Sequence, residues 1–224
     1  MISYKLMRSN RKTVGLYIRE GAVEVRAPLK MPKGDIDRFV ASKANWIADK
    51  LAKSNAHMAS RERFTLKYGD YVLYRGKQYP IAERLGDRIG FDEVCFYMPP
   101  KLTPEQLKYS CVHIYRLLAK RDLTKKTLEF AKRMSVMPSA IKINSAKTRW
   151  GSCSALKSVN FSWRLIMADD DVIDYVVVHE LAHIIELNHS ARFWSIIESV
   201  FPDYTSRKAR LKVLQDKLSH ENWD

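Results

Sequence analysis

The motif His-Glu-Leu-Ala-His at 179–183 combines two imidazoles and a carboxylate within five residues. On a helix, residues four apart lie about 40° apart around the axis, so His179 and His183 would point the same way. Two neutral imidazoles bind zinc well and leave coordination positions open. Glu180 would lie on the flank of that pair, where it can take a proton from a zinc-bound water. The motif therefore predicts a metal centre with a general base beside it.

A third candidate ligand, His189, follows six residues after His183. On a continuing helix it would point about 120° away from His183, so the chain must leave the helix between them. Asn188 tolerates the left-handed conformation that ends helices, and Ser190 can cap a new helix over 191–200. We therefore expect the three histidines to hold one zinc ion per chain.

The helix that carries the motif must be largely buried. Its start at 169–171 is acidic, which suits the positive end of a helix. Apolar residues surround the motif: Val172, Ile173, Val176, Val177, Leu181, Ile184 and Ile185. Imidazoles buried among these apolar residues need polar partners, and a metal ion would be such a partner.

The remaining elements predict an α+β chain. Strands are expected over 13–18, 22–27, 70–74, 78–82, 94–98, 141–144, 151–154 and 159–163. Helices are expected over 35–53 and from a capped start at Thr103-Pro104 to about Met134. We expect a strand-rich N-terminal part, 1–100, packed on a mostly helical domain, 101–224, or one continuous domain.

The charge is the one unusual bulk property. The 224 residues carry a net charge of +14, and 101–150 alone holds 12 Lys and Arg against 3 Asp and Glu. A basic stripe is expected on the long helix: Lys120, Lys125, Lys126, Lys132 and Arg133. Such a field favours anionic partners, here non-specific nucleic acid. The alternative is a solvated face that only keeps the protein soluble.

The cellular location of the protein is predicted from its cysteines and from the lack of long apolar segments. Three cysteines lie far apart and are odd in number, which does not fit a disulfide framework. No window of 18 apolar residues appears, and the first 25 residues lack the apolar core of a signal peptide. We expect a cytoplasmic protein without a membrane span.

The second half resembles one family over a long match. The matching stretches are 147–154, 160–166, 174–183, 188–190 and 193–194. They are similar to the YgjP-like zinc metallopeptidases and, more distantly, to the SprT-type and WLM-type zinc peptidases. The first hundred residues resemble the strand-rich beginning of that family more loosely.

The resemblance implies a gluzincin-like fold and a zinc-dependent hydrolase, in the first place a metallopeptidase acting on polypeptides. It implies the ligand role for the three histidines and the base role for Glu180. Asp170 stands where family members often have Pro, and Ser162 where Asn is common. Both departures lie outside the metal set.

Two arginines are further candidates. Arg149 and Arg164 flank the aromatic pair Trp150 and Trp163. Either could stabilise an oxyanion or clamp an anion near the metal. The structural alternative is an arginine stacked on tryptophan or paired with an acid.

Two other functions stay open. The same metal centre, surrounded by basic residues, could hydrolyse a nucleotide, as a nucleoside triphosphate pyrophosphatase does. Against this function, the sequence has no phosphate-binding Gly-rich loop. The chain could also be a nucleic-acid-binding module with a structural metal. Structural zinc usually has four protein ligands, whereas only three good ones are found.

Overall fold

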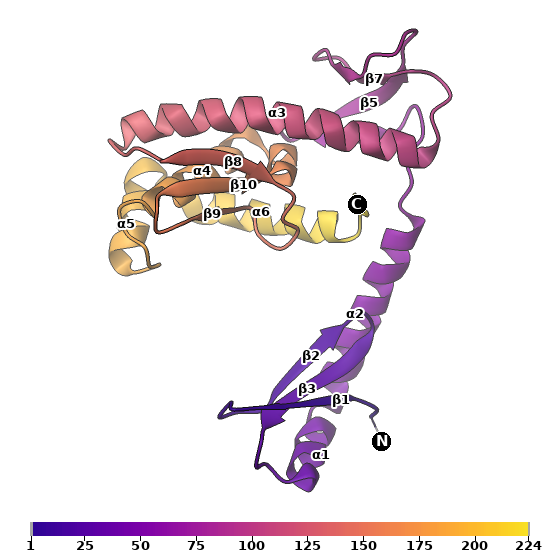
Figure 1. The fold of residues 1–224 in the computed structure, drawn as a ribbon, viewed down its shortest axis with the longest axis vertical. Helices are drawn as coiled ribbons and strands as arrows, with labels where there is room; N and C mark the ends of the chain where they lie inside the picture. Colours follow the sequence, from indigo (N-terminus) through magenta and orange to yellow (C-terminus); the bar gives the residue numbers. More distant parts are fainter. Residues whose placement is uncertain (1, 224) are drawn as a thin grey trace. The chain divides into compact units, whose positions relative to one another are not determined.

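The computed structural model describes residues 2–223, which form two compact units (Figure 1). The first extends to Phe64 and includes Lys217–Asn222, and the second spans Thr65–Asp216 and includes Trp223. Each has its own small sheets and helices, so the chain is an α+β protein, as the sequence predicts. No described helix is long and apolar enough to cross a membrane.

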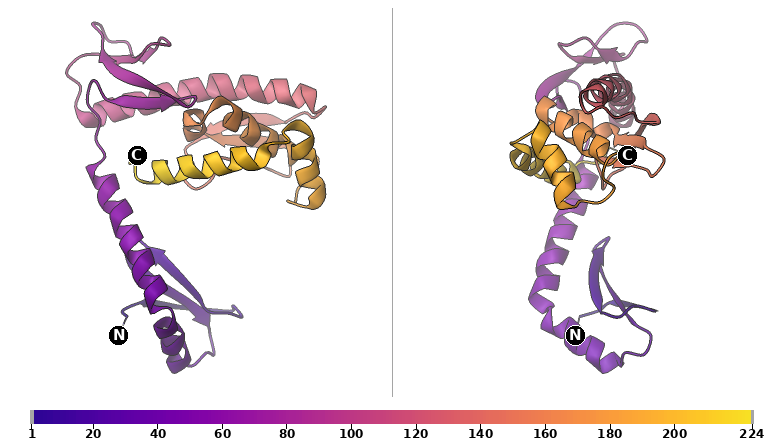
Figure 2. Two further views of the ribbon diagram at one scale, coloured as in Figure 1. Left: turned by 180° about the vertical axis from the view of Figure 1, so that it is seen from behind. Right: turned by 90° about the vertical axis from the view of Figure 1, so that its left-hand side faces the viewer.

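The first unit is a three-stranded sheet with two helices on one face. Its elements are β1 (Lys5–Ser9), β2 (Gly15–Arg19), β3 (Ala22–Pro28), α1 (Lys33–Ser42) and α2 (Ala44–Arg63). The central strand β3 is parallel to β1 and antiparallel to β2. The alternating Val23, Val25 and Ala27 face the core, which also holds Ile36 and Ile47 of the two helices. Both helices lie on the same side of the sheet (Figure 2).

The helix predicted over 35–53 is broken in two at Lys43. The Lys43 N–H donates to Val40 O at 3.1 Å, an i→i−3 bond that tightens the chain. The φ and ψ of Lys43, −107° and 16°, leave the helical range, and α2 starts with Ile47 N–H donating to Lys43 O at 2.9 Å. The apolar spacing continues across the break, so the pattern alone does not show it.

The second unit carries the histidine motif. Its elements are β4 (Tyr71–Tyr74), β5 (Lys77–Glu83), β6 (Gly90–Phe91), β7 (Phe96–Met98), α3 (Pro104–Arg133), β8 (Ala140–Asn144), β9 (Gly151–Cys153), β10 (Ser158–Ser162), the 3-10 helix η1 (Trp163–Met167), α4 (Asp170–Ala182), α5 (Ala191–Val200) and most of α6 (Tyr204–Ser219). One sheet has the order β4-β5-β7-β6 and the other β8-β10-β9. The strand β9 is therefore an edge strand, paired antiparallel with β10.

The long helix α3 forms as predicted. The Gln106 N–H donates to the Thr103 hydroxyl at 3.3 Å, and the Thr103 N–H donates to the Gln106 side chain at 2.8 Å, which completes a capping box. Apolar side chains are buried along the length of this helix, among them Leu107, Cys111, Ile114, Leu118 and Ala131. It packs against η1 and α4, so α3 supports the helix that bears the motif.

The first unit ends at Phe64 in this part of the chain, so the β4–β5 hairpin belongs to the second unit. The β4–β5 hairpin docks on η1 and on the start of α4, which joins it to the second unit. The Arg75 N–H donates to Ile166 O at 2.8 Å. Gly76, with φ of 74°, lies so close to Asp169 that a Cβ would meet the Asp169 Cα at 3.0 Å. These contacts join distant parts of the chain, so no local sequence pattern predicts them.

Candidate metal centre

Helix α4 positions the first two histidines and the glutamate. It begins after Asp169, and Asp170 and Asp171 occupy its first turn, where negative charge suits the helix end. Most of its other residues are buried: Val172, Ile173, Tyr175, Val176, Val177, Val178, Leu181 and Ala182. This packing fixes the helix on every side, and His183 is its C-terminal cap. The motif therefore sits where a rigid helix ends.

The chain leaves the helix before His189, as predicted, but it does so at Ala182, with His183 as the cap; Asn188 does not adopt the left-handed conformation expected to end the helix. The Ile185 N–H donates to Ala182 O at 3.0 Å in a tight turn. The Ser190 hydroxyl then accepts from the Phe193 N–H at 3.3 Å and caps α5. The turn and the new cap bring His189 back beside the helix end.

The three imidazoles converge. His179 Nε2 and His189 Nε2 lie 3.1 Å apart, and one ring nitrogen from each of the two and from His183 lies within 4.8 Å of the others. Two nitrogens bound tetrahedrally to one zinc at about 2.0–2.1 Å would lie about 3.3 Å apart. The donor set and its spacing therefore fit a single zinc ion.

The second histidine of the motif is held by a backbone carbonyl. His183 Nδ1 lies 3.2 Å from Glu186 O. A carbonyl only accepts, so Nδ1 carries the proton and Nε2 keeps its lone pair for a metal. For His179, Nδ1 is buried and has no hydrogen-bond partner among residues 2–223.

Phe193 packs against all three imidazoles. Its ring centroid lies 4.9 Å from that of His179, 4.5 Å from His183 and 4.7 Å from His189. The side chain is fully buried in α5. Trp194 stacks on the outer ligand, His189, at 5.7 Å. These aromatic rings limit the positions that the three ligands can take.

Burial sets the electrostatics of the site. It lowers the pKa of His179 to about 3 and also lowers the pKa of His183, so both imidazoles are neutral at pH 7. It raises the pKa of Glu180 to about 8, while the positive charge of Arg149 acts in the opposite direction. The site thus combines two neutral imidazoles with a carboxylate that readily takes a proton.

A glycine of the edge strand β9 lies directly over that carboxylate. A Cβ on Gly151 would be 2.6 Å from Glu180 Oε1 and 2.6 Å from its Cγ. Real Cβ contacts are not this short, so any larger residue at 151 would require the Glu180 side chain or the strand to shift. The carboxylate therefore lies between the metal ligands' helix and the edge strand.

A family model of the YgjP-like metallopeptidase domain matches residues 12–214. The chain belongs to the YgjP-like metallopeptidase family. The crystal structure of the metallopeptidase zymogen of Pyrococcus abyssi abylysin is 19% identical, with a TM-score of 0.39, over 45% of this chain and 98% of that chain. For the zymogen of Methanocaldococcus jannaschii jannalysin the values are 23%, 0.37, 42% and 96%. No match was found among curated proteins.

The two arginines of this YgjP-like chain lie in different surroundings. Arg164 is buried, donates to Ser145 O at 3.1 Å and stacks on Trp163 at 4.5 Å. These contacts match the structural alternative for Arg164, and its catalytic role stays a prediction. Arg149 is exposed and acts on the charge of Glu180. It is therefore the arginine whose charge reaches the base.

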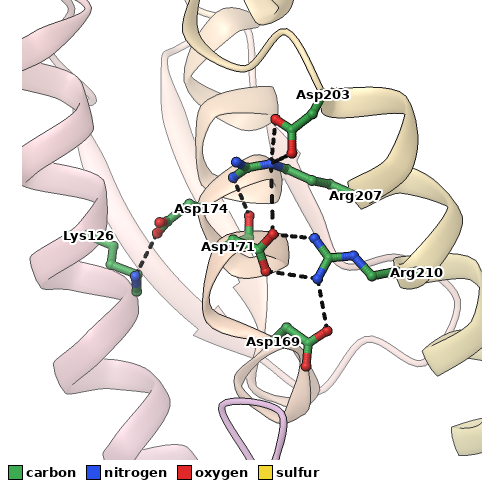
Figure 3. A network of polar contacts seen from close by, with 7 residues as sticks. All are labelled: Lys126, Asp169, Asp171, Asp174, Asp203, Arg207 and Arg210. Atoms are coloured by element: carbon green, nitrogen blue, oxygen red, sulfur yellow. Dashed lines mark hydrogen bonds and ion pairs between the residues drawn. The ribbon is translucent and has the colours of Figure 1, made fainter.

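In this YgjP-like chain a network of ion pairs connects the start of α4 to the neighbouring helices (Figure 3). Arg210 of α6 donates to Asp171 at 3.1 Å and to Asp169 at 3.2 Å. Lys126 of α3 donates to Asp174 at 2.6 Å. The Lys126 side chain is only 13% exposed, so this lysine does not belong to an exposed basic stripe. The carboxylate that pairs with Lys126 lies far along the sequence. The pattern of α3 alone therefore predicts that Lys126 is on the surface.

Two neighbours of the site had no predicted role. Tyr175 lies four residues before His179, with ring centroids 6.0 Å apart, and burial raises its pKa to about 12. The helical spacing from His179 is the signal that could have identified it. The close approach of Gly151 has no local signal, because it depends on how β9 packs on α4.

Proposed function

We propose that this YgjP-like chain is a zinc-dependent peptidase in which Glu180 is the general base. The observation that carries the proposal is the convergence of three histidine nitrogens beside a buried carboxylate. One zinc ion per chain, held by His179, His183 and His189, accounts for this donor set. Three ligands leave a fourth position open, which is typical of catalytic rather than structural zinc.

When bound, zinc would supply a Lewis acid that polarises a scissile carbonyl and lowers the pKa of water. The proton transfers fall to Glu180. Its carboxylate takes a proton from the attacking water and passes that proton to the nitrogen of the leaving amine. The buried setting supports this role, because it makes the carboxylate a stronger base than one in water.

The edge strand favours a polypeptide substrate. Within residues 2–223, β9 pairs only with β10, so its other edge keeps backbone donors and acceptors for a further strand. An extended peptide can add to such an edge through main-chain hydrogen bonds. Because Gly151 lies against Glu180, a peptide bound along β9 would pass beside the base.

Arg149 is proposed to act on charge that develops during the reaction. It is exposed and close enough to Glu180 to lower the pKa of that carboxyl. A cation at this place would stabilise an oxyanion at the scissile carbon. Arg164 is the weaker candidate for this role, because it stacks on Trp163 and donates to Ser145 O.

The alternatives use the same centre. A nucleotide phosphohydrolase would need groups for the phosphates, and its support is the net charge of +14. A nucleic-acid-binding module with a structural metal would need a fourth protein ligand. The histidine group as described contains only three ligand residues. We further propose a cytoplasmic location, which the three free cysteines support.

The test compares substrates. Zinc-loaded protein is incubated with an unfolded polypeptide and, separately, with a panel of nucleoside triphosphates, each with and without a chelator. New peptide termini, read by mass spectrometry, are expected only with zinc and only from the polypeptide. Zinc-dependent release of pyrophosphate would replace the proposal by the phosphohydrolase. If neither substrate is hydrolysed, the catalytic assignment fails.

A further inference from the structure

The N-terminal unit carries an excess of positive charge that the metal centre does not use. Residues 1–64 contain 14 Lys and Arg against 6 Asp and Glu, which is a net charge of +8. This segment was not predicted to be the basic part of the chain. A field of this strength in so small a unit favours a polyanion.

The strand register gathers cations on one face of its sheet. The core residues occupy the inner face, so alternation places Lys5, Tyr17, Arg19, Glu24 and Arg26 together on the outer face. We call these five residues and Arg11 the outer-face cluster. Both helices lie on the opposite side of the sheet (Figure 2), so no other element of the unit covers the cluster.

A partly exposed tyrosine stands at the centre of the cluster. The Arg26 guanidinium lies 4.8 Å from the centroid of the Tyr17 ring, and Tyr17 is 37% exposed. Gly15 makes room for both Arg11 and this ring: a Cβ there would be 2.9 Å from Arg11 Nη2 and 3.0 Å from the Tyr17 ring. The Tyr17 ring thus has the Arg26 guanidinium over it, and Gly15 leaves room beside the ring for Arg11.

The cluster has more cations than its carboxylate can neutralise. Glu24 accepts from Arg26 at 2.7 Å, and in the described strands it is the one carboxylate that the register places on this face. Among residues 2–223 no ion pair engages Lys5, Arg11 or Arg19, and Arg11 Nε is buried without a hydrogen-bond partner. Three cations are therefore available to an external anion.

We propose that the outer-face cluster binds single-stranded nucleic acid. Phosphates would pair with Lys5, Arg11 and Arg19, and a base would stack on the exposed part of the Tyr17 ring. The combination of cations with an aromatic ring distinguishes this partner from a merely acidic polypeptide, which has no bases to stack. The site is independent of the metal centre and of the proposed peptidase activity.

The test is fluorescence anisotropy with the full-length, zinc-loaded protein and a single-stranded DNA probe. Three phosphate contacts on a single strand predict a log–log salt slope of about −2. Tyr17→Ala should weaken binding roughly 5- to 100-fold, and Tyr17→Phe should keep it. Lys5→Glu with Arg19→Glu should abolish binding at about 0.15 M salt, where the Debye length is about 8 Å. Thermal melts of each variant check that the unit is folded.

Matched variants separate this face from others. Lys43→Glu with Lys50→Glu makes the same charge change at exposed positions of the helical side and should leave binding within about twofold. Lys120→Glu with Lys132→Glu tests the exposed part of the stripe predicted on α3. Loss of binding only with the α3 pair, or equal loss with all pairs, would overturn the proposal. So would polyglutamate binding as tightly as DNA, or Tyr17→Ala binding like wild type.

Discussion

Gly151 of strand β9 lies over the carboxylate of Glu180 so closely that a Cβ at this position would be 2.6 Å from Glu180 Oε1, and the side chain or the strand would have to shift. The contact joins an edge strand suited to a peptide with the residue proposed to move the proton. A glycine at this place therefore sets the position of the base as well as the path of the strand.

The first prediction is that Gly151→Ala lowers peptide hydrolysis about 100-fold, because a shift of about 1 Å in a catalytic group costs that much. The added methyl group must push the carboxylate or the strand away, at about 1–3 kcal/mol of stability. Zinc content should not change, since the three ligands lie elsewhere. The measurements are the rate of peptide cleavage and zinc per chain.

Gly34→Ala is the matched control, because a Cβ there meets no atom within 4 Å. It should cleave peptide like wild type. An unchanged rate in Gly151→Ala would show that the position of Glu180 does not limit the reaction.

The second prediction concerns zinc and pH. Burial lowers the pKa of His179 to about 3 in the folded chain, whereas an unfolded histidine titrates near 6.5. Between these values the unfolded state binds more protons, so burial of this neutral imidazole destabilises the fold as pH falls from about 6.5. Metal binding also requires neutral imidazoles and weakens in the same direction.

Zinc at 100 times its Kd should stabilise the fold by about 2.7 kcal/mol. A chelator should therefore lower the melting temperature more at about pH 7.5 than at about pH 5. His189→Ala should lose the metal and with it the response to chelator. Retention of full zinc by His189→Ala would show that the third ligand is another residue.

The third prediction concerns the ion pairs at the start of α4 (Figure 3). The hydrogen bond from Arg210 lowers the pKa of Asp171 below 3.8. Because the folded pKa is the lower one, the pair stabilises the fold above pH 3.8 and loses this effect as pH falls through the lowered pKa. Arg210→Gln should cost at most about 1 kcal/mol at pH 7, since both side chains are partly exposed.

Urea unfolding at pH 7 and at about pH 3 measures this difference. Lys212→Gln removes the same charge from an exposed position of the same helix and is the control. A cost of Arg210→Gln that persists in full at pH 3 would mean that the arginine stabilises the fold through packing instead.

The sequence predicts the local parts of the site well, because local rules govern them. The helical spacing of His179 and His183 and the cap at Ser190 follow from periodicity and propensity, whereas the helix ends at Ala182 rather than through a left-handed Asn188. The predicted start of α3 is confirmed for the same reason, since Thr103 and its neighbours form a capping box.

Other features depend on contacts between distant segments. Lys126 looks like a surface residue until Asp174 is packed beside it. The hairpin around Arg75 is tied to the second unit by contacts with distant segments, among them the hydrogen bond that η1 accepts from the Arg75 N–H. The short strand β6, of two residues, and helix α6, with its apolar residues unevenly spaced, gave no pattern strong enough to predict.

The most direct measurement compares wild type with Glu180→Gln in one experiment, in which zinc per chain and cleavage of an unfolded polypeptide are read from the same samples. Glutamine keeps the size of the side chain but cannot take the proton. We predict one zinc per chain in both proteins, cleavage by the wild type and a loss of at least about 100-fold in the variant, in line with general-base catalysis. Equal cleavage by the two proteins at equal zinc content would contradict the role of Glu180.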